Sequence, residues 1–177
     1  MIVYPPEYLE AASMLSKKYN VHLIVDEVAT GFGRTGRMFA CEHAGVSPDF
    51  MCMSKGITSG TMALSATVTA DEIYRAFYDD FDKEKTFFHG HTYTANPLAC
   101  SAALASLEVF ESEHTLEKIQ PVIRQLHEGL ADFAGFEHVG DIRGIGMVGI
   151  IELVKDSRTG EPFPASRRKG LEIFREG

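Results

Sequence analysis

The sequence predicts an α/β fold in which short buried strands alternate with helices around a layered sheet. Three continuous apolar runs are expected to be strands: residues 23–25, 49–54 and 63–69. Such runs are typical of central strands in a parallel sheet that is covered on both faces. Helical periodicity alternates with them as far as about Glu111, which is the pattern of an α/β layered sheet.

A helix is expected before the first strand and another after the third. After Pro5 and Pro6 the apolar residues recur at helical spacing: Leu9, Ala12, Leu15 and Tyr19. Asn20 is suited to end this helix as its C-terminal cap. Residues 69–72, Thr-Ala-Asp-Glu, have the form of a capping box. The helix that follows them is expected to turn three side chains inward: Ile73, Ala76 and Phe77.

The second half of the chain contains stronger helical signals and one β-rich stretch. Asn96 can cap a helix whose first residue is Pro97, and the alanines that follow predict close packing. A long amphipathic helix is expected from Thr115, where Pro121 should kink it or delay its start. Residues 138–153 are interpreted as β structure interrupted by glycines, and residues 165–176 as the beginning of a further helix.

These patterns predict two domains. Residues 1–112 are expected to belong to an α/β domain, and residues 113–177 to begin an α+β domain. The chain starts directly in a patterned segment and stops within an amphipathic one, so we expect it to be a fragment.

The composition is that of an ordinary globular domain, with 177 residues of which 45% are hydrophobic. A net charge of −8 argues against binding nucleic acid or an anionic membrane through charge alone. Cys41, Cys52 and Cys100 have no metal or redox spacing and are interpreted as small buried hydrophobes. The sequence has neither a signal-peptide pattern nor an apolar run of membrane-spanning length, so the cytoplasm is the expected location.

Residues 31–36, Gly-Phe-Gly-Arg-Thr-Gly, match the glycine pattern of a dinucleotide-binding loop. We reject this interpretation because such a loop must open directly into a helix, and little room for one remains before Pro48. Asp26 and Glu27 would in addition repel a diphosphate. The glycines are instead interpreted as turn residues.

Asp26 and Lys55 close two successive buried strands at what should be the same edge of the sheet. Taken singly, each could be a solvated residue at the end of a strand. Together they suit pyridoxal phosphate: a lysine forms a Schiff base with its aldehyde, and a carboxylate keeps its ring nitrogen protonated. His89 and His91 have the residue type of a metal pair, but no carboxylate or cysteine accompanies them at ligand spacing, so no metal site is expected.

Residues 23–60 resemble the core signature of the class III pyridoxal-phosphate-dependent aminotransferases, with Asp-Glu-Val, the Gly-x-Gly-Arg-Thr-Gly loop and Ser-Lys-Gly. "FFHGHTYTANPLACSAALASL" is similar to the phosphate-contact segment of that family and the helix after it. The segments "SGTMALSATVT" and "HGHTYTANPLAC" are most similar to one branch of the family. The resemblance implies part of the fold type I (aspartate aminotransferase-like) architecture: the C-terminal part of the large-domain sheet and the start of the small α+β domain.

The resemblance also implies residue roles. Lys55 would be the Schiff-base lysine, Asp26 would pair with the pyridinium nitrogen, and Val28 would pack against the ring. Thr92 would bind the cofactor phosphate of the neighbouring subunit in a homodimer, with His91 beside it.

Other positions carry weaker implications. Gly90 would lie near the substrate, and Arg34 would be structural. Ala95 and Ser59 depart from the family pattern, because glycine is common at both positions.

The reaction implied is transamination from a small-molecule amino donor to a keto acceptor. Members acting on an ω-amino acid, a diamine or ornithine are the alternatives, and a nucleotide-dependent oxidoreductase using residues 31–36 is a more distant one. Family members are more than twice as long as this chain. The resemblance places the glycine-serine phosphate loop, the ring-stacking aromatic residue and the carboxylate-binding arginine outside it, so this chain alone is expected to be inactive.

Overall fold

The computed structural model describes residues 1–176, which form two compact units. The sheet unit comprises Tyr4–Glu117, and the hairpin unit comprises Met1–Val3 together with the chain from Lys118 onward. Each unit has its own three-stranded sheet.

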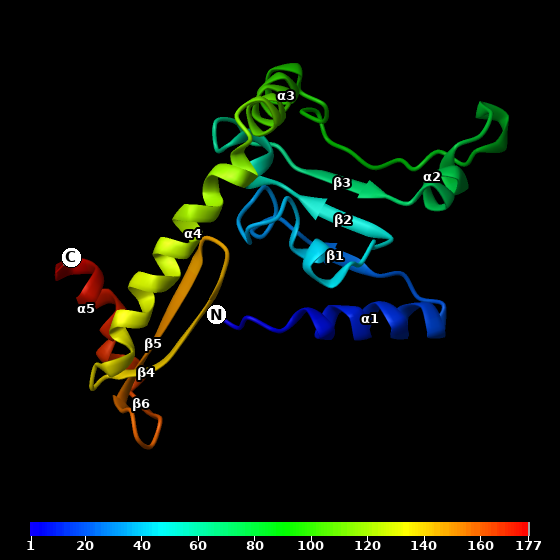
Figure 1. The fold of residues 1–177 in the computed structure, drawn as a ribbon. Helices are drawn as coiled ribbons and strands as arrows, with labels where there is room; N and C mark the ends of the chain where they lie inside the picture. Colours follow the sequence, from blue (N-terminus) through cyan, green and yellow to red (C-terminus); the bar gives the residue numbers. More distant parts are fainter. Residues whose placement is uncertain (177) are drawn as a thin grey trace. The chain divides into compact units, whose positions relative to one another are not determined.

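The sheet unit is built on β1 (Ile24–Asp26), β2 (Phe50–Met53) and β3 (Ala66–Thr69), in that order (Figure 1). The three predicted strands are therefore confirmed. β1 and β2 are parallel, but β3 runs antiparallel to β2, so the expectation of an all-parallel sheet was wrong. The connection over residues 54–65 contains no long helix of the kind that usually forms the crossover between parallel neighbours.

The expectation that both faces of these strands are covered was also wrong for β1 in the described chain. Val25 is buried, whereas Ile24 on the opposite face is 63% exposed. Because alternate strand residues point to opposite faces, one face of β1 packs and the other remains open.

Helix α1 (Pro6–Tyr19) ends at Asn20, whose backbone is left-handed with φ of 52°. The predicted cap is thus confirmed. Leu15 and Tyr19 are exposed, and the buried side chains of the helix are Ser13 and Ser16. The small serines let the helix lie against the 3-10 helix η1 (Ala40–Ala44).

Helix α2 (Asp71–Phe77) forms as predicted, but the expected capping box does not. Ala70 is the N-cap residue, and the Thr69 hydroxyl donates instead to the Asp49 carbonyl oxygen at 3.1 Å. Of the three side chains expected to turn inward, only Ile73 is partly buried, because little of the described chain packs on this helix. The short 3-10 helix η3 (Phe81–Lys83) follows.

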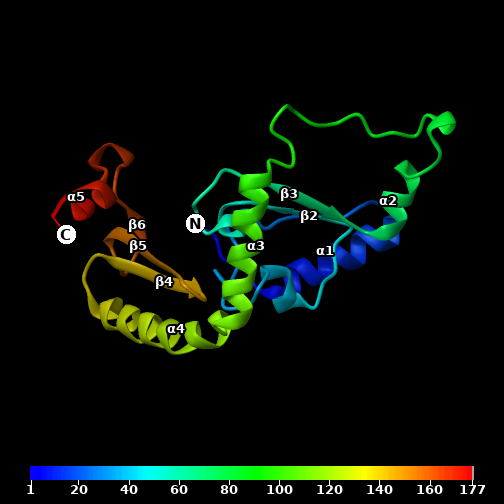
Figure 2. The same cartoon turned by 90° about the horizontal axis from the view of Figure 1, so that it is seen from above.

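Helix α3 (Pro97–Ser112) has the predicted cap: Asn96 Oδ1 accepts hydrogen bonds from the N–H groups of Leu98 and Ala99 at 2.9 and 3.3 Å. Its buried side chains are all small: Ala99, Ala103 and Ser106. This face lies against the 3-10 helix η2 (Lys55–Thr58), at the end of the sheet where β2 finishes (Figure 2). The alanines therefore do permit close packing, while Leu104 on another face is 68% exposed.

The hairpin unit begins within α4 (Thr115–Ala131), which starts at the predicted residue and continues past Pro121. After η4 (Asp132–Gly135), an antiparallel sheet forms from β4 (Val139–Ile145), β5 (Val148–Asp156) and β6 (Glu161–Pro162). The expected β structure is confirmed. The unit continues through η5 (Ala165–Arg167) into α5 (Lys169–Glu176).

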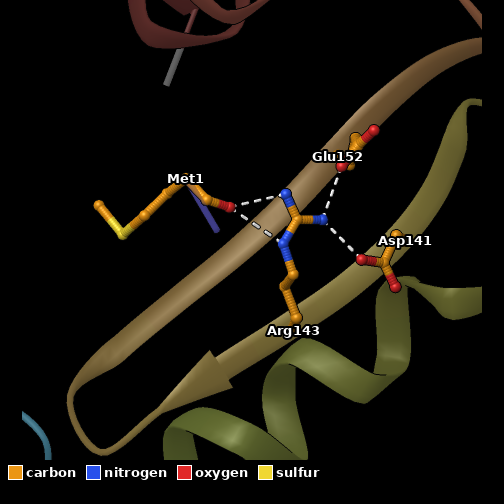
Figure 3. Close-up of polar contacts among 4 residues, drawn as sticks. All are labelled: Met1, Asp141, Arg143 and Glu152. Carbon is orange, nitrogen blue, oxygen red and sulfur yellow. Dashed lines mark hydrogen bonds and ion pairs between the residues drawn. The ribbon is translucent and has the colours of Figure 1, made fainter. Parts of the chain in front are cut away.

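Arg143 of β4 joins the first residue of the chain to this hairpin (Figure 3). Its Nε and one terminal nitrogen donate to the Met1 carbonyl oxygen at 3.1 and 2.8 Å. The other terminal nitrogen pairs with Asp141 at 2.5 Å and Glu152 at 2.6 Å, and these hydrogen bonds raise the pKa of Arg143. All three nitrogen atoms of the guanidinium group thus take part in contacts within the hairpin unit.

The chain exposes 13123 Å² of accessible surface. Two separate compact domains of these sizes would expose roughly 10,000 Å². Several large apolar side chains lie on this surface: Ile24, Phe81, Phe88 and Leu104. The chain by itself therefore leaves more total surface in water than two self-sufficient domains would, and large apolar side chains lie on it.

Ala95 occupies a left-handed backbone conformation, with φ of 55°, directly before the α3 cap. That conformation costs an L-residue about 1–2 kcal/mol, whereas glycine adopts it freely but loses about 0.5–1 kcal/mol of chain entropy. We expect Ala95→Gly to raise the free energy of unfolding by up to about 1 kcal/mol in urea denaturation of the protein. Ala105→Gly, at an exposed position within α3, should lower it by about 1 kcal/mol; a loss of stability at both positions would contradict the left-handed assignment.

Candidate active site

The carboxyl ends of β1 and β2 lie at one edge of the sheet, because the two strands are parallel. Asp26 is the last residue of β1 and is in register with Cys52 of β2. Lys55 is the second residue after the end of β2 and starts η2. The structure therefore places both predicted residues at the same edge, where ligands of open α/β sheets bind.

The Asp26 side chain is exposed on the open face of β1. Its Oδ1 accepts a hydrogen bond from the Val28 N–H at 2.9 Å. Among residues 1–176 no ion pair to this carboxylate is observed. The second oxygen, Oδ2, is thus available to a cation on a ligand.

Lys55 is exposed and has a left-handed backbone with φ of 44°. Within the described chain its Nζ takes part in no hydrogen bond or ion pair. The residues around it are fixed: the Ser54 hydroxyl donates to the Leu64 carbonyl at 2.7 Å, and the Thr58 hydroxyl to the Met62 carbonyl at 2.6 Å. A free amine therefore stands on a well-held turn, and such strained positions persist where the surroundings over-determine them.

The glycine loop of residues 31–36 supports this turn. Phe32, also left-handed with φ of 57°, packs on the cluster that includes Met53 and Ile57. A Cβ atom added to Gly56 would lie 2.6 Å from Phe32 Cβ, so only glycine fits beside it. The loop then leads only into the five-residue η1, which leaves the dinucleotide interpretation without the helix that it requires.

Glu27 is the residue whose importance was missed from the sequence. It is 2% exposed; its Oε1 accepts from the Cys41 N–H at 2.8 Å, and its Oε2 accepts from the Thr30 hydroxyl. Burial, followed by the nearby Glu27 charge, raises the pKa of the Cys41 thiol to about 11. Strand alternation was the available signal for the burial of Glu27, since neighbours in a strand face opposite ways and Asp26 is exposed.

The predicted phosphate-contact residues are not brought to this edge by any observed contact. Gly90, His91 and Thr92 lie in the exposed connection between η3 and α3. His91 organises a local turn, with its N–H donating to Thr94 Oγ1 at 2.9 Å and its Nδ1 accepting from the Tyr93 N–H at 3.1 Å.

No three potential metal-ligating side chains gather anywhere in residues 1–176. None of the helices in this part of the chain is long and apolar enough to cross a membrane. At one edge of the sheet the site offers the unpaired amine of Lys55 and the carboxylate of Asp26, which has a free oxygen. These groups fit a cofactor that carries an aldehyde and a basic ring nitrogen.

The class III aminotransferase family matches the chain over residues 1–177. The chain belongs to this family. Its relatives include the adenosylmethionine-8-amino-7-oxononanoate aminotransferase of Aquifex aeolicus, which is 57% identical over 98% of this chain and 38% of that protein. The probable γ-aminobutyrate transaminase 3 of rice, a mitochondrial protein, is 34% identical over 93% of this chain and 32% of that protein.

Solved structures agree with this assignment. The adenosylmethionine-8-amino-7-oxononanoate aminotransferase of Methanocaldococcus jannaschii superposes with a TM-score of 0.93 and 48% identity, over 98% of this chain and 40% of that one. A Bacillus anthracis aminotransferase gives a TM-score of 0.87 at 40% identity, over 94% of this chain and 37% of that one.

The predicted fold class, part of the α/β transaminase architecture, is thereby confirmed. The branch indicated by "SGTMALSATVT" and "HGHTYTANPLAC" is the adenosylmethionine-8-amino-7-oxononanoate aminotransferases, and that resemblance is confirmed as well. The chain spans about two fifths of the length of curated relatives in this branch.

The contact between Gly56 and Phe32 makes Gly56 of this aminotransferase chain intolerant of a side chain. We expect Gly56→Ala to lower the free energy of unfolding by about 1–3 kcal/mol, since a methyl group would be forced into packed atoms. Gly129→Ala is the control. A Cβ atom on Gly129 of α4 would meet no other atom, so this change should raise the free energy of unfolding by about 0.5–1 kcal/mol. Equal effects of the two changes in urea denaturation would contradict the close approach.

Proposed function

We propose that this chain is part of a pyridoxal-phosphate-dependent adenosylmethionine–8-amino-7-oxononanoate aminotransferase. The reaction transfers an amino group from S-adenosylmethionine to 8-amino-7-oxononanoate, which gives 7,8-diaminononanoate in biotin biosynthesis. The observation that carries the proposal is the pairing of an unengaged lysine with an exposed aspartate at the carboxyl ends of β1 and β2. Identities of 57%, 51% and 49% to proteins of this name support the choice of substrates.

Pyridoxal phosphate supplies an aldehyde that binds amines and a protonated ring that accepts electrons. Lys55 would hold the cofactor covalently through Nζ, and as a neutral amine its Nζ would accept a proton and return it. Asp26 is proposed to hold the proton of the ring nitrogen through Oδ2, while Oδ1 remains on the Val28 N–H. The Val28 side chain is proposed to pack against the ring.

Thr92 is proposed to bind the cofactor phosphate of a neighbouring subunit in a homodimer, with His91 beside it and Gly90 near the substrate. The exposure of this segment in the single chain is consistent with contacts made to another chain. No nucleic acid or membrane partner is proposed, and the protein is proposed to act in the cytoplasm.

Residues 1–112 are proposed to be part of the large cofactor-binding domain, and residues 113–177 the start of the small domain. The compact units, which divide between Glu117 and Lys118, support a division in this region, although Met1–Val3 pack with the hairpin unit. The chain of 177 residues alone is proposed to be inactive, because it spans only 38% of its relatives and leaves the site open on one side.

A second candidate is another class III activity, on an ω-amino acid, a diamine or ornithine. Similarity to the rice γ-aminobutyrate transaminase and to an ω-transaminase from Thermomicrobium roseum, at 34% and 36% identity, favours it less strongly. A panel of donors and acceptors on the protein at the length of its relatives separates the two. Product formation from S-adenosylmethionine and 8-amino-7-oxononanoate alone supports the proposal, whereas turnover only with ω-amino acids, diamines or ornithine would replace it.

The lysine assignment is tested by borohydride reduction of the cofactor-loaded protein followed by peptide mapping. The reduced cofactor is expected on Lys55 and should be lost from the map in Lys55→Ala, which should also abolish turnover. Lys85→Ala is the control, since Lys85 is engaged in an ion pair with Asp79 at 2.6 Å. Label recovered on any other lysine of the unmodified protein would sink the assignment.

A further inference from the structure

The reaction as proposed does not use the buried Glu27, which follows Asp26 directly in the sequence, or the glycine loop of residues 31–36. We propose that Glu27 is a positioning residue for Asp26: its buried carboxylate holds the turn whose Val28 N–H orients the Asp26 carboxylate. This inference rests on the proposed cofactor role of Asp26.

The Glu27 carboxylate is buried without an ion pair in the described residues. Burying a carboxylate is costly unless its oxygens accept hydrogen bonds. Both do so here, from the Cys41 N–H at 2.8 Å and from the Thr30 hydroxyl. The Glu27 side chain therefore holds two separate parts of the chain, one within the turn and one at the start of η1.

The backbone of Glu27 is fixed as firmly. Its N–H donates to the Cys52 carbonyl of β2 at 2.8 Å, and its own carbonyl accepts from the Gly31 N–H at 2.9 Å. A Cβ atom on Gly31 would lie 2.9 Å from that carbonyl oxygen. The first glycine of the loop is thus needed to close a turn over residues 27–31, a use unrelated to phosphate binding.

Val28 lies inside this turn, between the strand-fixed Glu27 and the bonded Gly31. The direction of its N–H is consequently set by the turn, and that N–H holds Asp26 Oδ1 at 2.9 Å. With Oδ1 occupied, the Asp26 carboxylate cannot rotate freely, and Oδ2 has no hydrogen bond from the described residues. The hydrogen bonds of Glu27 thereby act on Asp26 through Val28.

The test uses the cofactor-loaded protein at the length of its relatives and a double-mutant cycle. Glu27→Ala and Glu27→Gln are each made with Asp26 intact and in the Asp26→Asn background. Three quantities are measured: the rate constant of the first half-reaction with the amino donor, the midpoint pH of the visible absorbance of bound pyridoxal phosphate, and the thermal unfolding temperature.

With Asp26 intact, Glu27→Ala should slow the half-reaction roughly 10- to 100-fold, because small misplacements of a reacting group have effects of this size. It should shift the absorbance midpoint in the same direction as Asp26→Asn does. Glu27→Gln should stay within about threefold of the unmodified rate, since an amide oxygen still accepts from Cys41 and its NH₂ can donate to Thr30. In the Asp26→Asn background Glu27→Ala should slow the reaction no further, while it lowers the unfolding temperature equally in both.

Glu42→Gln is the matched control, because the exposed Glu42 also accepts a backbone N–H in this segment, that of Phe39 at 2.8 Å, and has no route to Asp26. It should leave the rate and the absorbance midpoint unchanged. If Glu27→Ala does not fold, Thr30→Val removes a single bond and should slow the reaction a few-fold, only when Asp26 is present. No effect of Thr30→Val would then overturn the inference.

The same fold-loss of rate in both backgrounds would show that Glu27 supports only the fold, and a Glu27→Gln variant as slow as Glu27→Ala would show that its charge matters rather than its hydrogen bonds. Either result overturns the inference. Failure of the proposed function gives different results. Either borohydride places no cofactor on Lys55 of the unmodified protein, or the Asp26→Asn variant keeps full activity. Loss of rate in Asp26→Asn without any change in Glu27→Ala removes the positioning role alone.

Discussion

The parallel pairing of β1 with β2 is the constraint on which the site depends. It sets Asp26 opposite Cys52, and the bond from the Glu27 N–H to the Cys52 carbonyl extends the pairing one residue beyond β1. A shift of one residue in this register would exchange the faces of Asp26 and Glu27 and bury the wrong carboxylate. The short turn after β2 then places Lys55 at the same edge, so two residues far apart in sequence share one edge of the sheet.

Much of this fold could be predicted because local signals are strong where a residue acts on its own backbone. Asn20 ends α1 and Asn96 begins α3, in both cases for reasons contained in a few neighbouring residues. The direction of β3 could not be predicted in this way, because it depends on how the connection over residues 54–65 returns. The capping box at residues 69–72 failed for a similar reason: the Thr69 hydroxyl had a better-placed acceptor at Asp49, across the sheet.

The candidate site shows the same division. The placement of Asp26 and Lys55 at one sheet edge could be predicted, because a charged residue at the end of an apolar strand is visible in the sequence and the edge follows from strand direction. Strand alternation could indicate that Glu27 faces away from Asp26, but its bonds to Cys41 and Thr30 could not be predicted, because they depend on the path of the loop. Phe32 was likewise hidden, because its contact with Gly56 is formed between residues that only the folded loop brings together.

The left-handed backbone of Lys55 has a consequence for the evolution of this chain. At Ala95, which shares that conformation, replacement by glycine is open to selection whenever stability is limiting. At Lys55 the same relief would delete the amine, so the strain of about 1–2 kcal/mol must be retained for as long as the activity is retained. The lineage is therefore expected to compensate elsewhere, and the tightly bonded segment from Ser54 to Leu64 is where substitutions should be tolerated least.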